Sequence, residues 1–414
     1  MTTKITFSKR SILWCLLFAL MLVPILAPHY FLEHAVIGAI IDIWVYASLL
    51  LMALFCICRL SSISVCIWLP LLSYVVLLVS TIANGNSSIA VLAVVKHGIK
   101  VLLLCCLVEC LMDDKNRLDC FLRTVRNITL FFFLLNMVAN VVYPKGIPSI
   151  TNNLAYPFFI YGNVNSTIRM VLPGMCCASI LDFRRGRHLS IYTWLFVIGF
   201  AYTFVCIYPI TTTMLAVVAV MVWMLFANRF WKKTQQIYMI VLCVVFLLEI
   251  FVVVLANTNV TAFIAGLFNK SSDLTGRAIL WNNAISCIVD SPLLGHGRQL
   301  LTEIKMAIGL ETGCHNYFLD VMYQRGVVGI VLLMILIVKP IINMKTKQLS
   351  VSTELYVLMG YCVALLMMFF AEPFFEYECY FIPIFYSVFL LTSKKKAKHM
   401  ERRRGMYENG SLFK

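Results

Sequence analysis

The chain has 414 residues, of which 61% are hydrophobic and only 13% are charged. Soluble domains have roughly 45–50% apolar and about 25% charged residues, so this composition excludes a soluble globular protein. The formal net charge is +15, but the basic residues lie in short clusters between apolar runs, which indicates the positive-inside rule rather than nucleic-acid binding. Because the apolar runs approach 20 residues, and strands of membrane barrels need only about 10, we expect an all-α integral membrane protein.

Twelve apolar runs are long enough to cross a bilayer as helices. In chain order they cover residues 11–28, 36–58, 62–82, 89–111, 127–143, 166–182, 189–207, 210–228, 236–256, 327–344, 353–371 and 377–393. The first run is followed by no convincing small-residue cleavage site, so we expect it to remain as an uncleaved span.

The distribution of lysine and arginine predicts the orientation of these spans. With the N-terminus inside, 25 of the 34 basic residues fall on the cytoplasmic side, and every cytoplasmic connection contains at least one. We therefore expect residues 1–393 to form a multi-pass domain of the cytoplasmic (inner) cell membrane, with both termini in the cytoplasm. Its two long external loops are residues 144–165 and 257–326, and residues 394–414 form a basic cytoplasmic tail.

The second external loop is the longest polar stretch between spans. Its apolar residues recur at helical spacing over residues 280–288, before Pro292, and again over residues 301–308, before Gly309. We expect two short amphipathic helices that lie on the outer face of the membrane.

Nine basic residues lie outside the cytoplasmic segments, against the positive-inside bias: Lys96, Lys100, Lys145, Arg169, Lys270, Arg277, Arg298, Lys305 and Arg325. Among them Lys96, Lys100, Arg169, Arg277 and Arg298 are the candidates for binding an anionic substrate. Arg277 begins the first loop helix, where free backbone N–H groups favour an anion such as a phosphate. Arg169 lies near the outer end of the sixth span, where it either binds substrate or snorkels to the interface. Lys96 and Lys100 lie one turn apart in the fourth span, which indicates a cavity for anionic groups unless both snorkel.

His315 and Asn316 open the stretch that leads into the tenth span. A histidine outside the membrane can accept a proton near neutral pH or donate a hydrogen bond to a phosphate oxygen. Glu311 precedes this pair and is a further candidate for substrate binding. Trp281 is another, because its ring either stacks on a sugar or belongs to the aromatic belt of the membrane interface.

The sequence contains no Asp-x-Asp, HExxH or CxxC motif, so we expect no metal and no other cofactor. Cys287 and Cys314 are the cysteines that fall clearly in the second external loop, and they fit either a disulfide or two free thiols. Most other cysteines lie inside apolar runs, where they act as small hydrophobic residues.

Four motifs in this region resemble the signature loop of the O-antigen ligase and Wzy polysaccharide polymerase superfamily: GR-x3-W at 276–281, P-x-x-G-x-G at 292–297, HN at 315–316 and G-x-x-G at 326–329. The resemblance runs from about residue 162 to residue 329. It implies a GT-C class glycosyltransferase that uses a sugar chain carried on a polyprenyl pyrophosphate at the outer face of the membrane. It also implies that Arg277 binds pyrophosphate and that His315 takes part in catalysis.

One feature of the superfamily is absent. Many members carry a Ser-Arg pair at the outer start of a span near the middle of the chain, whereas residues 208–214 read YPITTTM here. Arg169 or a lysine of the fourth span is the candidate to replace that positive charge.

The motifs are common to polymerases and ligases, and the divergence of the Ser-Arg region is the reason that we expect a polymerase of lipid-linked oligosaccharide repeat units for an O-antigen, capsule or exopolysaccharide. A sugar hydroxyl attacks the anomeric carbon of the donor chain while the polyprenyl pyrophosphate leaves; Arg277 and Arg298 stabilise its charge, and His315 acts as base or phosphate ligand. The expected partners are this lipid-linked oligosaccharide and the bilayer, and the resemblance allows a flippase and a chain-length regulator. Two alternatives remain: an O-antigen ligase-type transferase to a lipid or protein acceptor, and a polysaccharide flippase or transporter.

Overall fold

The computed structural model describes residues 9–148, 157–186, 189–207, 220, 233–254, 277–309, 313–347, 352–370, 372, 374 and 376–393. Most of them lie in helices, which are in chain order α1 (Lys9–Leu22), α2 (His29–Glu33), α3 (Ala35–Ile57), α4 (Trp68–Ala83), α5 (Ser88–Leu111), α6 (Lys115–Val142), α7 (Val164–Arg184), α8 (Ile191–Ile207), α11 (Thr234–Leu248), α13 (Arg277–Asp290), α14 (Leu301–Ile308), α15 (Tyr317–Lys347), α16 (Thr353–Phe369) and α17 (Glu378–Thr392).

Five short elements complete the described chain. Two 3-10 turns, Leu60–Ser62 and Val65–Ile67, precede α4, and a π-helical segment, Glu249–Val254, continues α11. Strands β1 (Phe158–Phe159) and β2 (Gly162–Asn163) form a two-residue antiparallel hairpin before α7.

The helices confirm the prediction of an all-α membrane protein. Eleven of the twelve predicted spans coincide with a described helix, and nearly all of the remaining one, residues 210–228, lies outside the described residues. Among the described helices, seven are long and apolar enough to cross a membrane, and shorter apolar helices lie within α8, α16 and α17. The two helices predicted for the second external loop are α13 and α14, and Gly309 ends α14 with a φ of +107°. The tail, residues 394–414, lies outside the described residues.

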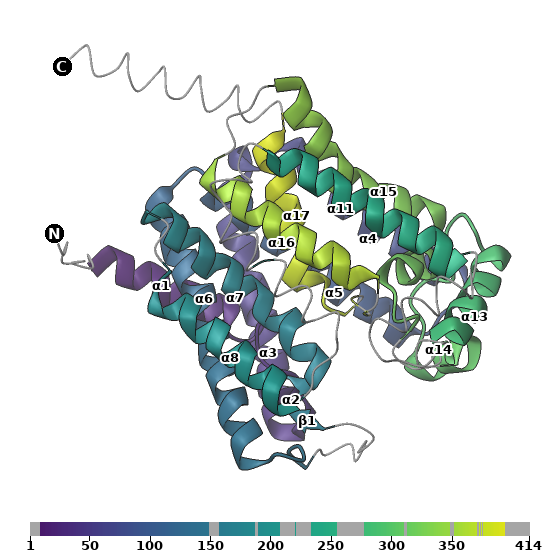
Figure 1. Cartoon of the computed structure of the whole chain (residues 1–414), viewed down its shortest axis with the longest axis horizontal. Helices are drawn as coiled ribbons and strands as arrows, with labels where there is room; N and C mark the ends of the chain where they lie inside the picture. The colour runs from purple at the N-terminus through teal and green to yellow at the C-terminus, as the bar shows by residue number, and fades with distance from the viewer. Residues whose placement is uncertain are drawn as a thin grey trace.

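Contacts between the loops that join the helices show which loops lie together at each end of the bundle. At one end the side chain of Asn86, after α4, donates to the carbonyl of His296, after α13 (2.8 Å). At the other end Arg184, at the close of α7, forms an ion pair with Glu354, at the start of α16 (2.9 Å). Figure 1 accordingly shows α13 and α14 at the end of the molecule away from the start of α1. The alternating direction of the spans agrees with this arrangement.

Glycine holds the loop after α13 against the start of the tenth predicted span. The N–H groups of Val327 and Val328 donate to the carbonyls of Pro292 and Leu293 (2.8 and 3.3 Å). Just before them Gly326 interrupts α15 with a φ of +59°, and a Cβ there would lie 2.3 Å from the Leu293 backbone. Only glycine permits both this conformation and this approach. The P-x-x-G-x-G and G-x-x-G motifs therefore build the joint between the loop and the span.

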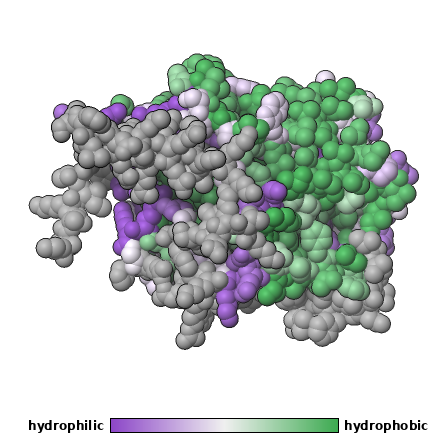
Figure 2. All heavy atoms as spheres, turned by 90° about the horizontal axis from the view of Figure 1, so that it is seen from above, coloured by the Kyte–Doolittle hydropathy of each residue, from purple (hydrophilic) through white to green (hydrophobic). Residues whose placement is uncertain are grey.

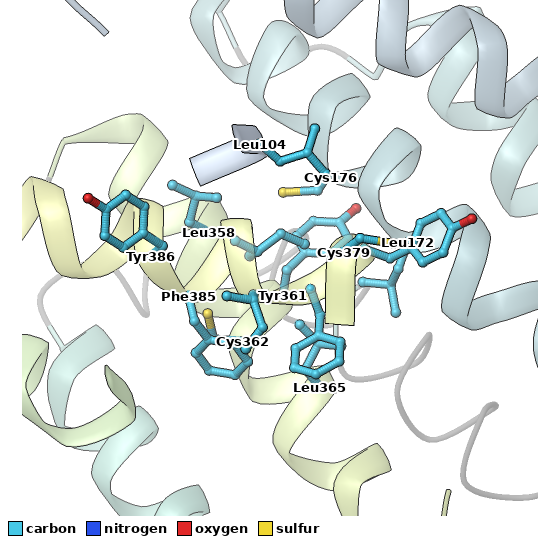
Figure 3. Packing of buried hydrophobic residues seen from close by; sticks show 14 of the residues in the cluster. Leu104, Leu172, Cys176, Leu358, Tyr361, Cys362, Leu365, Cys379, Phe385 and Tyr386 are labelled. Atoms are coloured by element: carbon cyan, nitrogen blue, oxygen red, sulfur yellow. The ribbon is translucent and has the colours of Figure 1, made fainter. Parts of the chain in front are cut away.

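The helices present apolar side chains outward, as a protein dissolved in lipid requires. Val36, Ile43 and Phe131 are each more than 60% exposed. Figure 2 shows a broad hydrophobic region over one face, with hydrophilic residues gathered mainly on its left side. The core lies between the helices, and Figure 3 shows part of it, where Leu358, Tyr361 and Phe385 pack between α16 and α17.

A buried ion pair joins three helices of this core. Both Glu378 oxygens accept hydrogen bonds from Nη2 of Arg325 (2.7 Å each), and the two side chains are 2% and 4% exposed. The Glu378 carboxylate also accepts from the hydroxyls of Tyr317 (2.7 Å) and Tyr74. Since these residues come from α17, α15 and α4, one carboxylate fixes the relative position of three helices.

Breaking this pair should destabilise the protein strongly. We expect Arg325→Met to lower the free energy of unfolding by about 3–5 kcal/mol, because it leaves the Glu378 carboxylate buried without its cation. The double variant Arg325→Met/Glu378→Gln should recover much of the loss, because it removes both charges. Thermal unfolding in detergent measures both effects. A single variant that unfolds at the wild-type temperature would contradict the role given to the pair.

Candidate functional site

His315 lies in the short connection that leads into α15, and its backbone has a φ of +50°, the one non-glycine residue with a left-handed φ among those described. Such a conformation costs on the order of 1–3 kcal/mol and persists only where the surroundings impose it. The preceding residue is held at both backbone groups. Cys314 donates its N–H to Asp320 (2.9 Å), and its carbonyl accepts from the indole N–H of Trp281 (3.0 Å).

Asn316 holds the other side of His315. Its side chain is fully buried, and its Oδ1 accepts from the N–H of Leu319 (2.9 Å) at the start of α15. Its Nδ2 donates to both carboxylate oxygens of Glu249 (2.9 Å each) and to the carbonyl of Phe370 (3.2 Å). Glu249 opens the π-helical segment, and π-bulges occur frequently at functional sites. The HN dipeptide is thus anchored to α11 and to the end of α16.

The charges of two arginines from distant parts of the chain, Arg277 and Arg169, act on the imidazole of His315. Arg169, in α7, is 7% exposed; its Nη2 donates to Ser166 (3.1 Å), and its guanidinium lies 4.3 Å from the centroid of the Tyr377 ring. Arg277 is half-buried where the described part of α13 begins. The site therefore combines α7, α13 and the turn before α15.

The electrostatics of the site favour a neutral imidazole beside two cations. Burial, then Arg277 and then Arg169 lower the pKa of His315 to about 3. Burial also lowers the pKa of Arg277 from its ordinary value, while the nearby Glu372 carboxylate acts in the opposite direction. A neutral imidazole can accept a proton, and an anion bound beside the guanidinium groups would raise its pKa again.

The other predicted cations lie elsewhere. Lys96 forms an ion pair with Asp42 of α3 (2.5 Å) and lies over the ring of Tyr46, so the structure does not bring it to His315. Arg298 pairs with Glu376 (2.9 Å) in the connection between α16 and α17. Lys100 is half-buried in α5.

The structure also places the remaining predicted residues. Trp281 was expected at a surface, against a sugar or in the interfacial belt, but it is 2% exposed and packs against Phe370 with ring centroids 5.9 Å apart. This burial follows from its hydrogen bond to the turn before His315. Cys287 and Cys314 are free thiols. Glu311 lies outside the described residues.

Three further residues join the site that sequence reasoning did not single out for it: Glu249, Glu372 and Tyr377. Glu249 had a usable signal, because it is the sole charged residue of the predicted span 236–256 and an ionisable residue inside a span is by itself a functional candidate. Tyr377 had no usable signal in the sequence, since aromatic residues are common where spans end. In the described part of the chain, no group of three or more His, Cys, Asp or Glu side chains is arranged to hold a metal ion.

The fold and this site define a polytopic α-helical membrane protein with two arginines around a histidine at one end of the bundle. Residues 173–334, which include Arg277 and His315, match the O-antigen ligase family. Over this segment the chain is therefore similar to the O-antigen ligase family, and the resemblance of its motifs is confirmed.

Two curated relatives match shorter segments. The exopolysaccharide production protein ExoQ of Rhizobium meliloti is 32% identical over 99 residues, which are 21% of this chain and 23% of that protein. An uncharacterized protein of Haemophilus influenzae is 29% identical over 96 residues, which are 20% of this chain and 24% of that protein. The matches thus span about a quarter of the length of each relative. No solved structure matches the chain.

His315 should make the folded protein less stable as the medium is acidified. Its pKa is about 3 when folded and returns to 6.5 on unfolding, so below pH 6.5 the unfolded chain binds a proton that the folded protein does not. Stability is therefore complete above this pH and falls toward pH 3, by up to about 1.4 kcal/mol per pH unit. Thermal unfolding in detergent near pH 7 and near pH 5 should show a smaller acid-induced loss for His315→Gln than for the wild type. An equal loss in both proteins would mean that His315 is not kept neutral.

Proposed function

We propose that this chain polymerises lipid-linked oligosaccharide repeat units, as in the synthesis of an O-antigen, capsule or exopolysaccharide. It transfers a glycan chain from polyprenyl pyrophosphate to a sugar hydroxyl of the next repeat unit, at the outer face of the cytoplasmic membrane. The observation that carries the proposal is the convergence of Arg169 and Arg277 on a neutral His315. The match of residues 173–334 to the O-antigen ligase family and the partial likeness to an exopolysaccharide production protein support a role in polysaccharide biosynthesis.

The donor pyrophosphate is bound beside Arg277 and Arg169. A guanidinium presents its N–H groups as a planar fork that pairs with two phosphate oxygens, and a desolvated cation stabilises a phosphate more than an exposed one does. Arg169 supplies the positive charge that other members draw from their Ser-Arg pair. Its position is set by the aromatic ring of Tyr377 and by Ser166.

The transfer itself exchanges one bond to the anomeric carbon for another. The acceptor hydroxyl oxygen bonds to that carbon, and the bond to the pyrophosphate oxygen breaks, with its electron pair leaving on the pyrophosphate. The hydroxyl proton goes to His315, whose pKa rises when the donor charge offsets the two arginines. Fixed cations around the developing negative charge lower the barrier, and a positioned base adds roughly 10²–10⁴-fold to the rate.

The chemistry of this site favours a transferase over a flippase, because a neutral base beside two cations suits bond exchange. Whether the acceptor is the next repeat unit or a different lipid or protein distinguishes a polymerase from a ligase. Arg298, Asn316 and Glu311 remain proposed contacts of the sugar or phosphate groups, and a flippase and a chain-length regulator remain proposed partners.

Loss of either central residue should stop elongation without unfolding the protein. We expect Arg277→Ala and His315→Ala to reach normal membrane levels while cells accumulate outward-facing lipid-linked single repeats, because the donor charge or the proton is no longer accommodated. Arg277→Lys should remain impaired, since it keeps the charge but loses the planar fork. Lys305→Ala, at an exposed position on α14, is the matched control and should give wild-type chain lengths.

Analysis of the lipid-linked glycans separates the alternatives. Normal chain lengths in Arg277→Ala and His315→Ala would show that the site is assigned wrongly. Long lipid-linked polymer in these variants would indicate a ligase, and single repeats that face the cytoplasm would indicate a flippase.

The orientation of the protein is tested separately. Because 25 of the 34 basic residues fall on the predicted cytoplasmic side, reporter fusions within the loop after α13 should be active outside, and fusions after residue 394 should be active inside. A cytoplasmic loop would place the site on the wrong side for this donor.

A further inference from the structure

A cavity of about 330 Å³ lies inside the bundle and is not used by the proposed donor site. Most of its lining is apolar and comes from α1 and the residues after it, α5, α6, α7, α16 and α17. Leu104, Cys176 and Leu358 belong to its wall and are labelled in Figure 3. Protein interiors are close-packed, and ligand pockets have volumes of roughly 300–1,000 Å³. A space of this size therefore indicates a place for a ligand.

The cavity has a charged mouth at the end of the bundle opposite α13 and α14. Asp113, Lys115, Arg184 and Glu354 line it there, where α5 and α7 end and α6 and α16 begin. Asp113 and Lys115 are exposed, so the cavity opens at this end. This is the end that the distribution of basic residues predicts to face the cytoplasm. The mouth therefore lies at the level of the lipid head groups of that leaflet.

Two prolines within helices help to keep the cavity open. Pro173 of α7 and Pro383 of α17 both line it. A proline inside a helix lacks the N–H of the regular hydrogen bond, and its ring collides with the carbonyl four residues earlier. Neither helix can therefore pack regularly at this level. The hydroxyl of Ser387, which also lines the cavity, donates to the carbonyl of Pro383 (2.6 Å), so it needs no polar ligand.

The dimensions of the cavity fit one hydrocarbon chain. Its lining extends along α7 from Arg184 to Pro173, about 16 Å at 1.5 Å per residue, and along α17 from Leu391 to Cys379, about 18 Å. Its volume is about twice the ~150 Å³ of an engineered apolar cavity that holds benzene, which leaves room for on the order of a dozen carbon atoms. Such apolar cavities stay dry and bind apolar molecules. A long, narrow ligand without polar groups is therefore favoured over a compact polar one.

The charges at the mouth fit a head group that carries both signs. The lining contains two basic and two acidic side chains, and the Arg184 guanidinium is already paired with Glu354 (2.9 Å) and with Asp119. Among the described residues, the ammonium of Lys115 has no hydrogen bond or ion pair. It can therefore donate to a phosphate oxygen, while the Asp113 carboxylate can accept from an ammonium group. A purely anionic head group would meet the acidic side chains as well.

We propose that this cavity binds one acyl chain of a zwitterionic phospholipid, whose head group lies between Lys115 and Asp113. The site does not depend on the proposed function, because neither donor nor acceptor glycan takes part in it. Its occupant fills the space between α7 and α17, the helices next to the donor site. Pro173 lies one helical turn after Arg169, and α17 begins directly after Tyr377. The lipid therefore supports the two helices behind the donor site from the opposite leaflet.

Lipid retention by the full chain tests the proposal. The protein is released from nanodiscs made of equal amounts of phosphatidylethanolamine and phosphatidylglycerol, and retained lipid is identified by native mass spectrometry. We expect the wild type to keep one phosphatidylethanolamine and Val108→Phe to keep none, because Val108 lines the cavity and the larger ring fills it. Val95→Phe, at a lipid-facing position of the same helix (37% exposed), is the matched control and should keep one.

Each other result of this experiment contradicts a stated part of the proposal. A wild type that keeps no lipid, or a Val108→Phe variant that keeps as much as Val95→Phe, would overturn the cavity as a lipid site. Retention of phosphatidylglycerol instead would overturn the zwitterionic head group. Displacement of the retained phospholipid by added polyprenyl phosphate would show that the cavity serves a lipid of the glycan pathway.

Two measurements remain decisive if Val108→Phe does not fold. Lys115→Met should weaken phosphatidylethanolamine binding about two- to fivefold, as expected for one exposed charge, whereas Lys9→Met, at an exposed lysine of the same end, should not. Equal binding by both variants would reject the position of the head group. A phospholipid with a photoreactive diazirine near the end of its acyl chain should label residues 173–180 of α7 in the wild type. Labelling confined to lipid-facing residues such as Ile43 and Phe131 would reject the cavity.

Discussion

A charge inside a membrane helix bundle needs an opposite charge or a hydrogen-bond donor, and the carboxylate of Glu378 meets this requirement with groups from three helices. It is 2% exposed and is bonded to Arg325, Tyr317 and Tyr74. Tyr317 directly follows the HN dipeptide, and Glu378 ends the connection that contains Tyr377. The same carboxylate therefore fixes both the turn that bears His315 and the segment that contacts Arg169. The position of the site depends on the satisfaction of this buried charge.

The signature motifs divide into residues that build the site and residues that act in it. Gly326 has a structural role, because it lets the chain pass close to the Leu293 backbone, where a side chain would collide. Trp281 also builds, since its indole N–H holds the carbonyl of Cys314. We propose that Arg277 and His315 are the residues that contact the substrate. Some residues of the signature motifs therefore have a structural role, and a smaller number are proposed to contact the substrate.

Strain and charge are concentrated at the same place. His315 keeps a left-handed backbone because Cys314 and Asn316, on either side of it, are each held by several hydrogen bonds. Burial and the charges of Arg277 and Arg169 lower the pKa of the imidazole, and the Glu372 carboxylate acts on Arg277. An anionic substrate is therefore favoured by the protein, and its arrival changes the basicity of the histidine. In the proposed reaction, binding of the donor and transfer of the proton are therefore coupled through the charges around His315.

The sequence by itself determined the membrane class, the helices and the loop, because apolar runs of span length and the spacing of glycines and proline depend on local chemistry. It also gave Arg277, His315 and Asn316 as site candidates, because they belong to neighbouring motifs of one loop. It left Arg169 open between substrate and interface, and it treated Lys96 and Lys100 as one pair. Only the tertiary structure brought Arg169 to His315, separated Lys96 toward Asp42 and joined Asn316 to Glu249. The physical reason is that the faces of a membrane span are all apolar, so its sequence periodicity hardly indicates which face contacts which neighbouring helix. The partners of buried charges are therefore decided by the packing of the helices.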